Sequence, residues 1–155
     1  MTPEYLHVVL NHLPLFGLAI GAALLLASLI RKSGELRGAA LAVVAVTGLS
    51  AWPAAEFGEG GYDRVYSMSN SEGQKWLQAH SKRADKAVPV VYVTVALAVA
   101  ALVAARKKPA FAPPLSIVTL FAAALSLVLL GWVARAGGQI RHPEFRRHTT
   151  GGERP

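Results

Sequence analysis

The stretch HLPLFGLAIGAALLLASLI, residues 12–30, decides the fold. From Leu13 to Ile30 only Ser28 is polar, and about 20 apolar residues are enough for one helix to cross a bilayer. Comparable apolar segments recur, and the four together cover approximately residues 5–30, 38–55, 87–105 and 114–134. The sequence therefore predicts an all-α fold, an integral membrane four-helix bundle.

Composition supports this class and excludes several chemistries. Of the 155 residues, 53% are hydrophobic and 16% are charged, and the charges cluster between the apolar segments. The chain has no cysteine, which excludes disulfides, iron–sulfur clusters, thiolate metal ligands and covalent c-type haem attachment. Histidine, Asp, Glu, Met and the backbone remain as possible metal ligands.

The chain divides into a transmembrane domain, residues 1–136, and a polar C-terminal tail, residues 137–155. Residues 56–86 form a long loop between the second and third helices, in which SEGQKWLQAHSKRADKA (71–87) predicts an amphipathic helix with Ser71 as its N-cap. Gly137 and Gly138 are expected to end the fourth helix.

Basic residues set the expected orientation. The two short loops, RKSGELR (31–37) and RKKPAFAP (106–113), carry six basic residues against Glu35 alone. The opposite side holds more basic residues in total and all the other acids, but we give the short loops more weight. The chain is thus expected in a bacterial inner membrane with both termini outside. The net charge of +7 is attributed to contacts with lipid headgroups, and no nucleic-acid motif is present.

All five histidines are expected on the side of the termini. His7 and His12 lie at the start of the first helix, His80 shortly before the third apolar segment, and His142 after the fourth. Neutral imidazole is the common axial ligand of b-type haem, so these four are candidate iron ligands. Each also has a simpler interpretation, as an interfacial, solvated or helix-linking side chain.

Other residues could complete a haem site. Arg83 and Arg141 are candidate partners of the haem propionates. Gly17 and Gly21 could admit either a flat macrocycle or, more simply, a neighbouring helix.

Spacing suggests how the ligands would pair. Five residues separate His7 from His12, so their side chains point about 140° apart on a helix and favour different partners. We expect His12 and His80 to form an axial pair, and His7 and His142 to form a second pair if two haems bind. One haem, with His7 and His142 donating hydrogen bonds, is the alternative.

The chain resembles a group of small bacterial four-helix membrane proteins of unknown function. The resemblance rests on HVVLNHLPLFG (7–17), TGLSAWPAAEF (47–57), HSKRADKA (80–87) and AGGQIRHPEF (136–145), which follow in the same order. Relatives carry recurring histidines at the positions of His7, His12, His80 and His142, which implies haem or another metal.

The sequence thus favours a b-type haem protein with one or two haems, which transfers electrons to a redox partner at the outer face as a subunit of a larger complex. No enzyme motif is present, so an electron carrier is favoured over an independent enzyme. Two alternatives stay open: a haem-free accessory or anchoring subunit, and a copper or zinc protein with histidine ligands.

Overall fold

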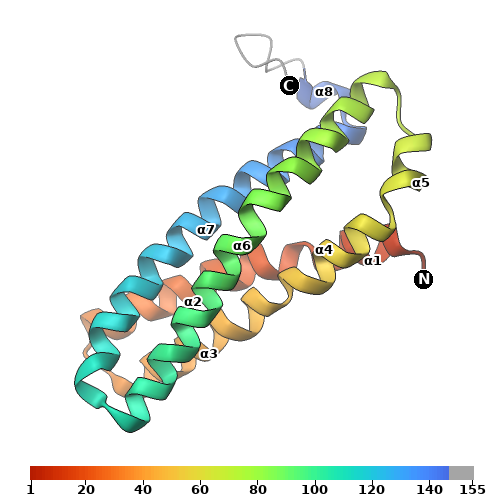
Figure 1. Ribbon diagram of the computed structural model, residues 1–155. Helices are drawn as coiled ribbons and strands as arrows, with labels where there is room; N and C mark the ends of the chain where they lie inside the picture. Colours follow the sequence, from red (N-terminus) through yellow and green to blue (C-terminus); the bar gives the residue numbers. More distant parts are fainter. Residues whose placement is uncertain (147–155) are drawn as a thin grey trace.

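The computed structural model of the chain describes residues 1–146 (Figure 1). Its principal helices are α1 (Pro3–Leu10), α2 (His12–Ile30), α3 (Gly34–Leu49), α4 (Ala51–Gly60), α5 (Tyr62–Ser67), α6 (Ser71–Lys107), α7 (Ala112–Arg141) and α8 (Pro143–Arg146), with a short 3-10 helix at Pro109–Phe111. The described residues contain no strand. The all-α four-helix arrangement predicted from the sequence is confirmed.

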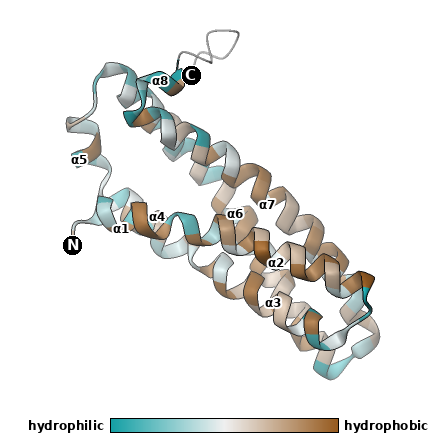
Figure 2. Ribbon diagram, turned by 180° about the vertical axis from the view of Figure 1, so that it is seen from behind, coloured by the Kyte–Doolittle hydropathy of each residue, from teal (hydrophilic) through white to brown (hydrophobic). Residues whose placement is uncertain are grey.

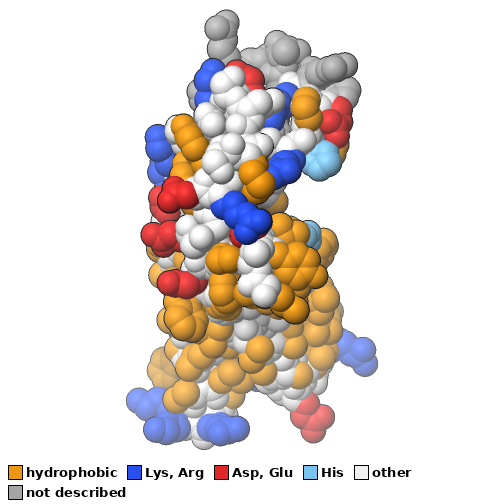
Figure 3. Space-filling view, turned by 90° about the vertical axis from the view of Figure 1, so that its right-hand side faces the viewer, with side chains coloured by type: hydrophobic (Ala, Val, Ile, Leu, Met, Phe, Trp, Pro, Cys, Tyr) orange, Lys and Arg blue, Asp and Glu red, His pale blue; other side chains and the backbone are white. Residues whose placement is uncertain are grey.

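Four stretches of helix are long and apolar enough to cross a membrane: Pro3–Ile30, Gly34–Gly60, Ser71–Lys107 and Pro109–Arg141. They define a membrane protein. Apolar residues fill the middle of the bundle (Figure 2), and an apolar band separates basic side chains at one end from mixed charges at the other (Figure 3). We call the end with residues 31–33 and 108–111 the loop end, and the end with α5 and α8 the terminal end.

Three of the four predicted helices are clearly longer than their apolar segments. Helix α4 continues to Gly60 and α6 begins at Ser71, so most of the predicted loop 56–86 is helical. The N-cap of α6 is Asn70 rather than Ser71, because the Asn70 side chain accepts the Gly73 N–H at 2.8 Å. Helix α7 passes through Gly137 and Gly138 and ends at Arg141, so the predicted glycine terminator was wrong. Residues 147–155 of the predicted tail lie outside the described part.

Two prolines break the first two membrane helices. Pro14 and Pro53 lack the N–H that would bond to the carbonyls of Leu10 and Leu49, and these are the last residues of α1 and α3. Beyond these breaks α1 and α4 diverge from α6 and α7, so the terminal end opens into two arms (Figure 1).

Small and hydroxyl side chains hold the bundle together below the opening. Cβ atoms at Gly17 and Gly21 would collide with Thr47 and Val44, so these glycines let α2 and α3 approach closely. Buried Thr94 on α6 and Ser126 on α7 share a hydrogen bond of 2.9 Å. Van der Waals packing and interhelical hydrogen bonds are the main attractions between helices in lipid.

Replacing Gly21 by Ala should therefore destabilise the protein by about 1–3 kcal/mol through overpacking against Val44. Gly38 on α3 is the control, since nothing lies within 4 Å of a Cβ built there, and Gly38→Ala should be neutral or stabilising by up to about 1 kcal/mol. Unfolding of both variants in detergent micelles measures the difference. Equal stability of the two variants would contradict close α2–α3 packing at Gly21.

Candidate functional site

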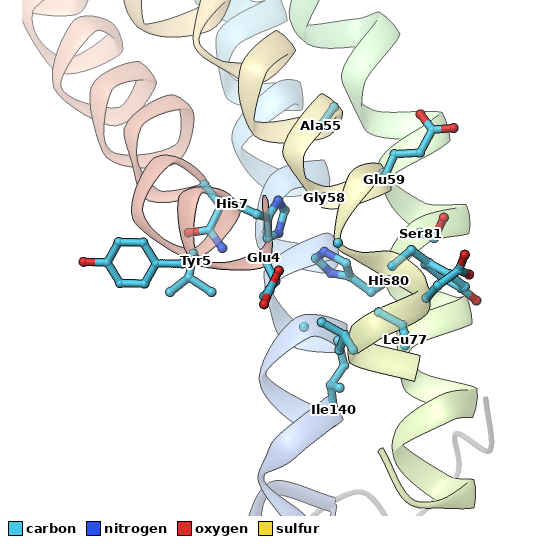
Figure 4. Close-up of a pocket in the computed structure, with 18 of the residues that line it drawn as sticks. Glu4, Tyr5, His7, Ala55, Gly58, Glu59, Leu77, His80, Ser81 and Ile140 are labelled. Carbon is cyan, nitrogen blue, oxygen red and sulfur yellow. The ribbon is translucent and has the colours of Figure 1, made fainter. Parts of the chain in front are cut away.

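The opening between the two arms forms a cleft at the terminal end. Its volume is about 1190 Å³, and residues of α1, α4, α5, α6 and α7 line it. Binding sites for small molecules and cofactors typically enclose about 300–1,000 Å³ and combine an apolar wall with few polar groups. The cleft is therefore large enough for a cofactor, and His7 and His80 project into it from opposite arms (Figure 4).

His7 is fixed against the backbone of α4. Its Nδ1 lies 2.7 Å from the carbonyl oxygen of Ala54. Because a carbonyl can only accept, Nδ1 carries the proton and donates it. Gly58 follows one helical turn after Ala54, and a Cβ at Gly58 would lie 2.8 Å from His7 Nδ1. The glycine is needed for the imidazole to reach the carbonyl.

His80 repeats this arrangement on the other arm. Its Nδ1 lies 3.0 Å from the carbonyl oxygen of Val133 on α7. Gly137 follows Val133 by one turn, and a Cβ at Gly137 would lie 3.1 Å from both Nδ1 and Cε1 of His80. Each arm thus combines a histidine on its first helix with a carbonyl and a glycine, four residues apart, on its second.

The two imidazoles meet in the cleft. Their ring centroids are 5.9 Å apart and their planes are inclined by 87°. Because each Nδ1 donates to a carbonyl, the neutral tautomer leaves a lone pair on each Nε2, the usual preparation of a metal-binding histidine. Within residues 1–146, neither Nε2 has a hydrogen-bond partner.

The structure places His12 and His142 elsewhere. His12 is exposed, stacks on Phe16 and directs Nδ1 to the carbonyl of Val8 in its own helix at 3.1 Å. His142 is also exposed, with Nδ1 2.7 Å from Glu144 Oε1. The structure therefore pairs His80 with His7, whereas the sequence suggested His80 with His12 and His7 with His142.

Of the other four candidate residues, one lines the cleft and three do not. Arg141 lines the cleft, where its guanidinium lies 3.9 Å from Met68 Sδ. Arg83 does not line it, since its guanidinium lies against Trp132 and Trp76. Gly17 and Gly21 contact α3 and serve helix packing.

Several residues of the cleft had no role predicted from the sequence. Glu4 lies one turn before His7, and its Oε1 forms a 3.1 Å salt bridge with Arg64 of α5. Its buried Oε2 has no hydrogen-bond partner within the described residues. Gly58 and Gly137 were also missed as contacts of histidine. Gly58 follows Trp52, and Gly137 follows Trp132, within six residues. This recurring order of tryptophan and glycine was the feature of the sequence that could have indicated two similar sites.

Tyr62 of α5 adds a neutral donor to the cleft wall. Burial, together with the neighbouring Tyr66 and Asp63, raises the pKa of its phenol above the ordinary value. The phenol therefore stays protonated at neutral pH and can donate a hydrogen bond to a ligand in the cleft.

Comparison of the chain with models of protein families, with curated proteins and with solved structures found no match. The resemblance drawn from the sequence motifs therefore stays a prediction, and the geometry of the cleft is the basis for the function.

Replacing Gly58 or Gly137 by Ala should displace the imidazole beside it. The loss of a hydrogen bond, about 1 kcal/mol, is similar in size to the gain in helix propensity, so the tautomer of the imidazole is measured rather than the stability. Gly131→Ala on α7 is the matched control, since a Cβ there meets nothing within 4 Å. Nitrogen-15 NMR of labelled histidine should show the Nδ1–H tautomer for His7 and His80 in the control, and loss of one such signal in each test variant. Unchanged tautomers in both test variants would refute the arrangement.

Proposed function

We propose that this chain is a membrane b-type haem protein in which His7 and His80 are the two axial ligands of one haem. The proposal rests on one observation, the facing pair of imidazoles whose Nδ1 protons are held by main-chain carbonyls. Two imidazoles bound to one metal from opposite sides, at about 2 Å each, have ring centroids about 6 Å apart. The measured 5.9 Å agrees with this separation.

The number of protein ligands favours haem over a bare ion. Within the described residues, no group of three or more His, Cys, Asp or Glu side chains could hold a metal. Zinc sites use three or four protein ligands, whereas a porphyrin brings four nitrogens and needs only two axial ligands from the protein. Copper or zinc is therefore the weaker hypothesis.

Bound haem would supply one-electron chemistry. With His7 and His80 filling both axial positions, no position is left for a substrate, so electron transfer is the expected activity. The carbonyls of Ala54 and Val133 orient the imidazoles, and Arg141 is the candidate partner of a propionate. A redox partner would dock at the terminal end, consistent with a subunit of a larger complex.

The orientation is also a proposal. The basic residues of the loop end favour the cytoplasmic side, which supports an orientation with the cleft and both termini outside a bacterial inner membrane. A haem-free accessory subunit remains the competing function, because the same hydrogen bonds join α1 to α4 and α6 to α7 whether or not a cofactor binds.

The cofactor prediction is tested by absorption spectra of the protein purified from membranes. We expect a Soret band with a sharp α-band on reduction and about one haem per chain, since one axial pair is present. His7→Ala and His80→Ala should each abolish bis-histidine ligation. His12→Ala and His142→Ala are the controls and should keep the spectrum, because both side chains are exposed outside the pair.

Absence of haem, with no copper or zinc by elemental analysis, would favour the accessory subunit. Two haems per chain, or loss of haem in His12→Ala, would contradict the pair His7 and His80. Either result would favour the pairs expected from the sequence, His12 with His80 and His7 with His142.

The topology prediction is tested by reporter fusions at the C-terminus. A reporter that is active only in the periplasm should give signal, and one that is active only in the cytoplasm should not, because the basic loop end is retained inside. The reverse pattern would show that the total count of basic residues sets the orientation.

A further inference from the structure

Arg83 of α6 does not line the cleft and lies instead against two tryptophan rings. Its guanidinium carbon lies 4.6 Å from the ring centroid of Trp132 and 5.9 Å from that of Trp76. Its Nη1 donates to the carbonyl of Trp132 at 3.0 Å. Cation–π contacts and one hydrogen bond thus hold the guanidinium in a fixed plane.

The charge of Arg83 has no acidic partner among residues 1–146. In the described part of the chain no carboxylate pairs with it, and one of its five N–H donors is used by the Trp132 carbonyl. Lys86 follows by three residues on the same helix and is exposed, which adds a second positive charge nearby. The remaining guanidinium donors form a fork suited to a planar or tetrahedral oxyanion.

The position of Arg83 in the membrane defines the class of anion. It lies one turn before the apolar run of α6 that begins at Ala87, at the level where Trp side chains favour the membrane interface. Trp132 ends an exposed apolar stripe on α7, formed by Phe121, Leu125, Val128 and Trp132, which are 72%, 53%, 69% and 39% exposed. An acyl chain can lie along this stripe with its headgroup at Arg83.

We propose that Arg83, fixed between Trp132 and Trp76, binds the phosphodiester of an anionic membrane phospholipid whose acyl chain covers the α7 stripe. The proposal does not rest on haem binding, since Arg83 does not line the cleft. It gives Arg83, which the sequence suggested as a propionate partner, a different anionic ligand.

Trp132 provides the reporter for the test. The chain has three tryptophans, and Trp76 is only 5% exposed. A Trp52→Phe background therefore leaves Trp132 as the main lipid-accessible fluorophore. The full chain is reconstituted into phosphatidylcholine vesicles with a minor fraction of phosphatidylglycerol. Brominated acyl chains, which quench tryptophan, are placed on either lipid at the same mole fraction.

We expect phosphatidylglycerol to be preferred over phosphatidylcholine at Trp132 by about fivefold, the contribution of one basic residue near an anionic lipid surface. Arg83→Gln should reduce the preference to about onefold, and Arg83→Lys should retain part of it. Lys82→Gln is the matched control, because it removes the same charge from the residue directly before Arg83. Lys82 contacts neither tryptophan ring, so the preference for phosphatidylglycerol should persist in this variant.

Equal quenching by the two lipids in the background protein would overturn the proposal without any change at Arg83. Loss of the preference in Lys82→Gln, with its retention in a folded Arg83→Gln protein, would overturn it as well. Abolition of the preference by inorganic phosphate, but not by sodium chloride of the same ionic strength, would assign the site to free phosphate instead.

Discussion

The architecture of the terminal end depends on the missing N–H of two prolines. Backbone groups inside a bilayer must bond within the protein, which keeps membrane segments helical. Pro14 and Pro53 each leave one carbonyl without its helical partner, and each helix breaks four residues before its proline. Because both breaks lie in the same arm, α1 and α4 turn away together from α6 and α7, and the space between the arms becomes the cleft. Close packing persists on the other side of the breaks, where Gly17 and Gly21 lie against α3.

Within the cleft, both arms hold an imidazole in the same way, by a hydrogen bond to a main-chain carbonyl. A main-chain carbonyl has two lone pairs, so it can accept from a side chain in addition to its helical N–H. A Cβ one turn further along would lie 2.8 Å from His7 Nδ1 at Gly58 and 3.1 Å from the His80 ring at Gly137, so glycine at both positions leaves room for the imidazole. The result is a pair of imidazoles held by neutral acceptors rather than by carboxylates, although Glu4, Glu59 and Asp63 are all near enough to line the cleft. The orientation of each imidazole is thus set by a main-chain atom of a neighbouring helix.

The two proposed sites lie on neighbouring faces of α6, since His80 and Arg83 are three residues apart and both contact α7. His80 faces the cleft, while Arg83, less than one turn further on, faces Trp132 of α7 and the surrounding membrane. Consecutive carbonyls of α7, those of Trp132 and Val133, accept from Arg83 and His80. A shift of α7 relative to α6 would therefore alter both hydrogen bonds together.

The sequence alone determined the class of this protein, because four apolar segments and basic short loops follow directly from the cost of polar groups in lipid. It also predicted that His7, His80 and His142 lie at the same end of the bundle, since each helical residue adds a fixed rise of about 1.5 Å. It predicted the polar helix that begins near residue 71, but it missed that this helix is continuous with the third membrane helix as α6, and it missed the extension of α4 to Gly60. Only the tertiary structure decided which histidines meet. The position of a residue along its helix follows from the sequence of that helix alone. The direction in which His7, His12 or Arg83 points depends on how each helix is rotated against its neighbours. That rotation is set by contacts between residues far apart in the sequence, such as His7 with Ala54 and His80 with Val133.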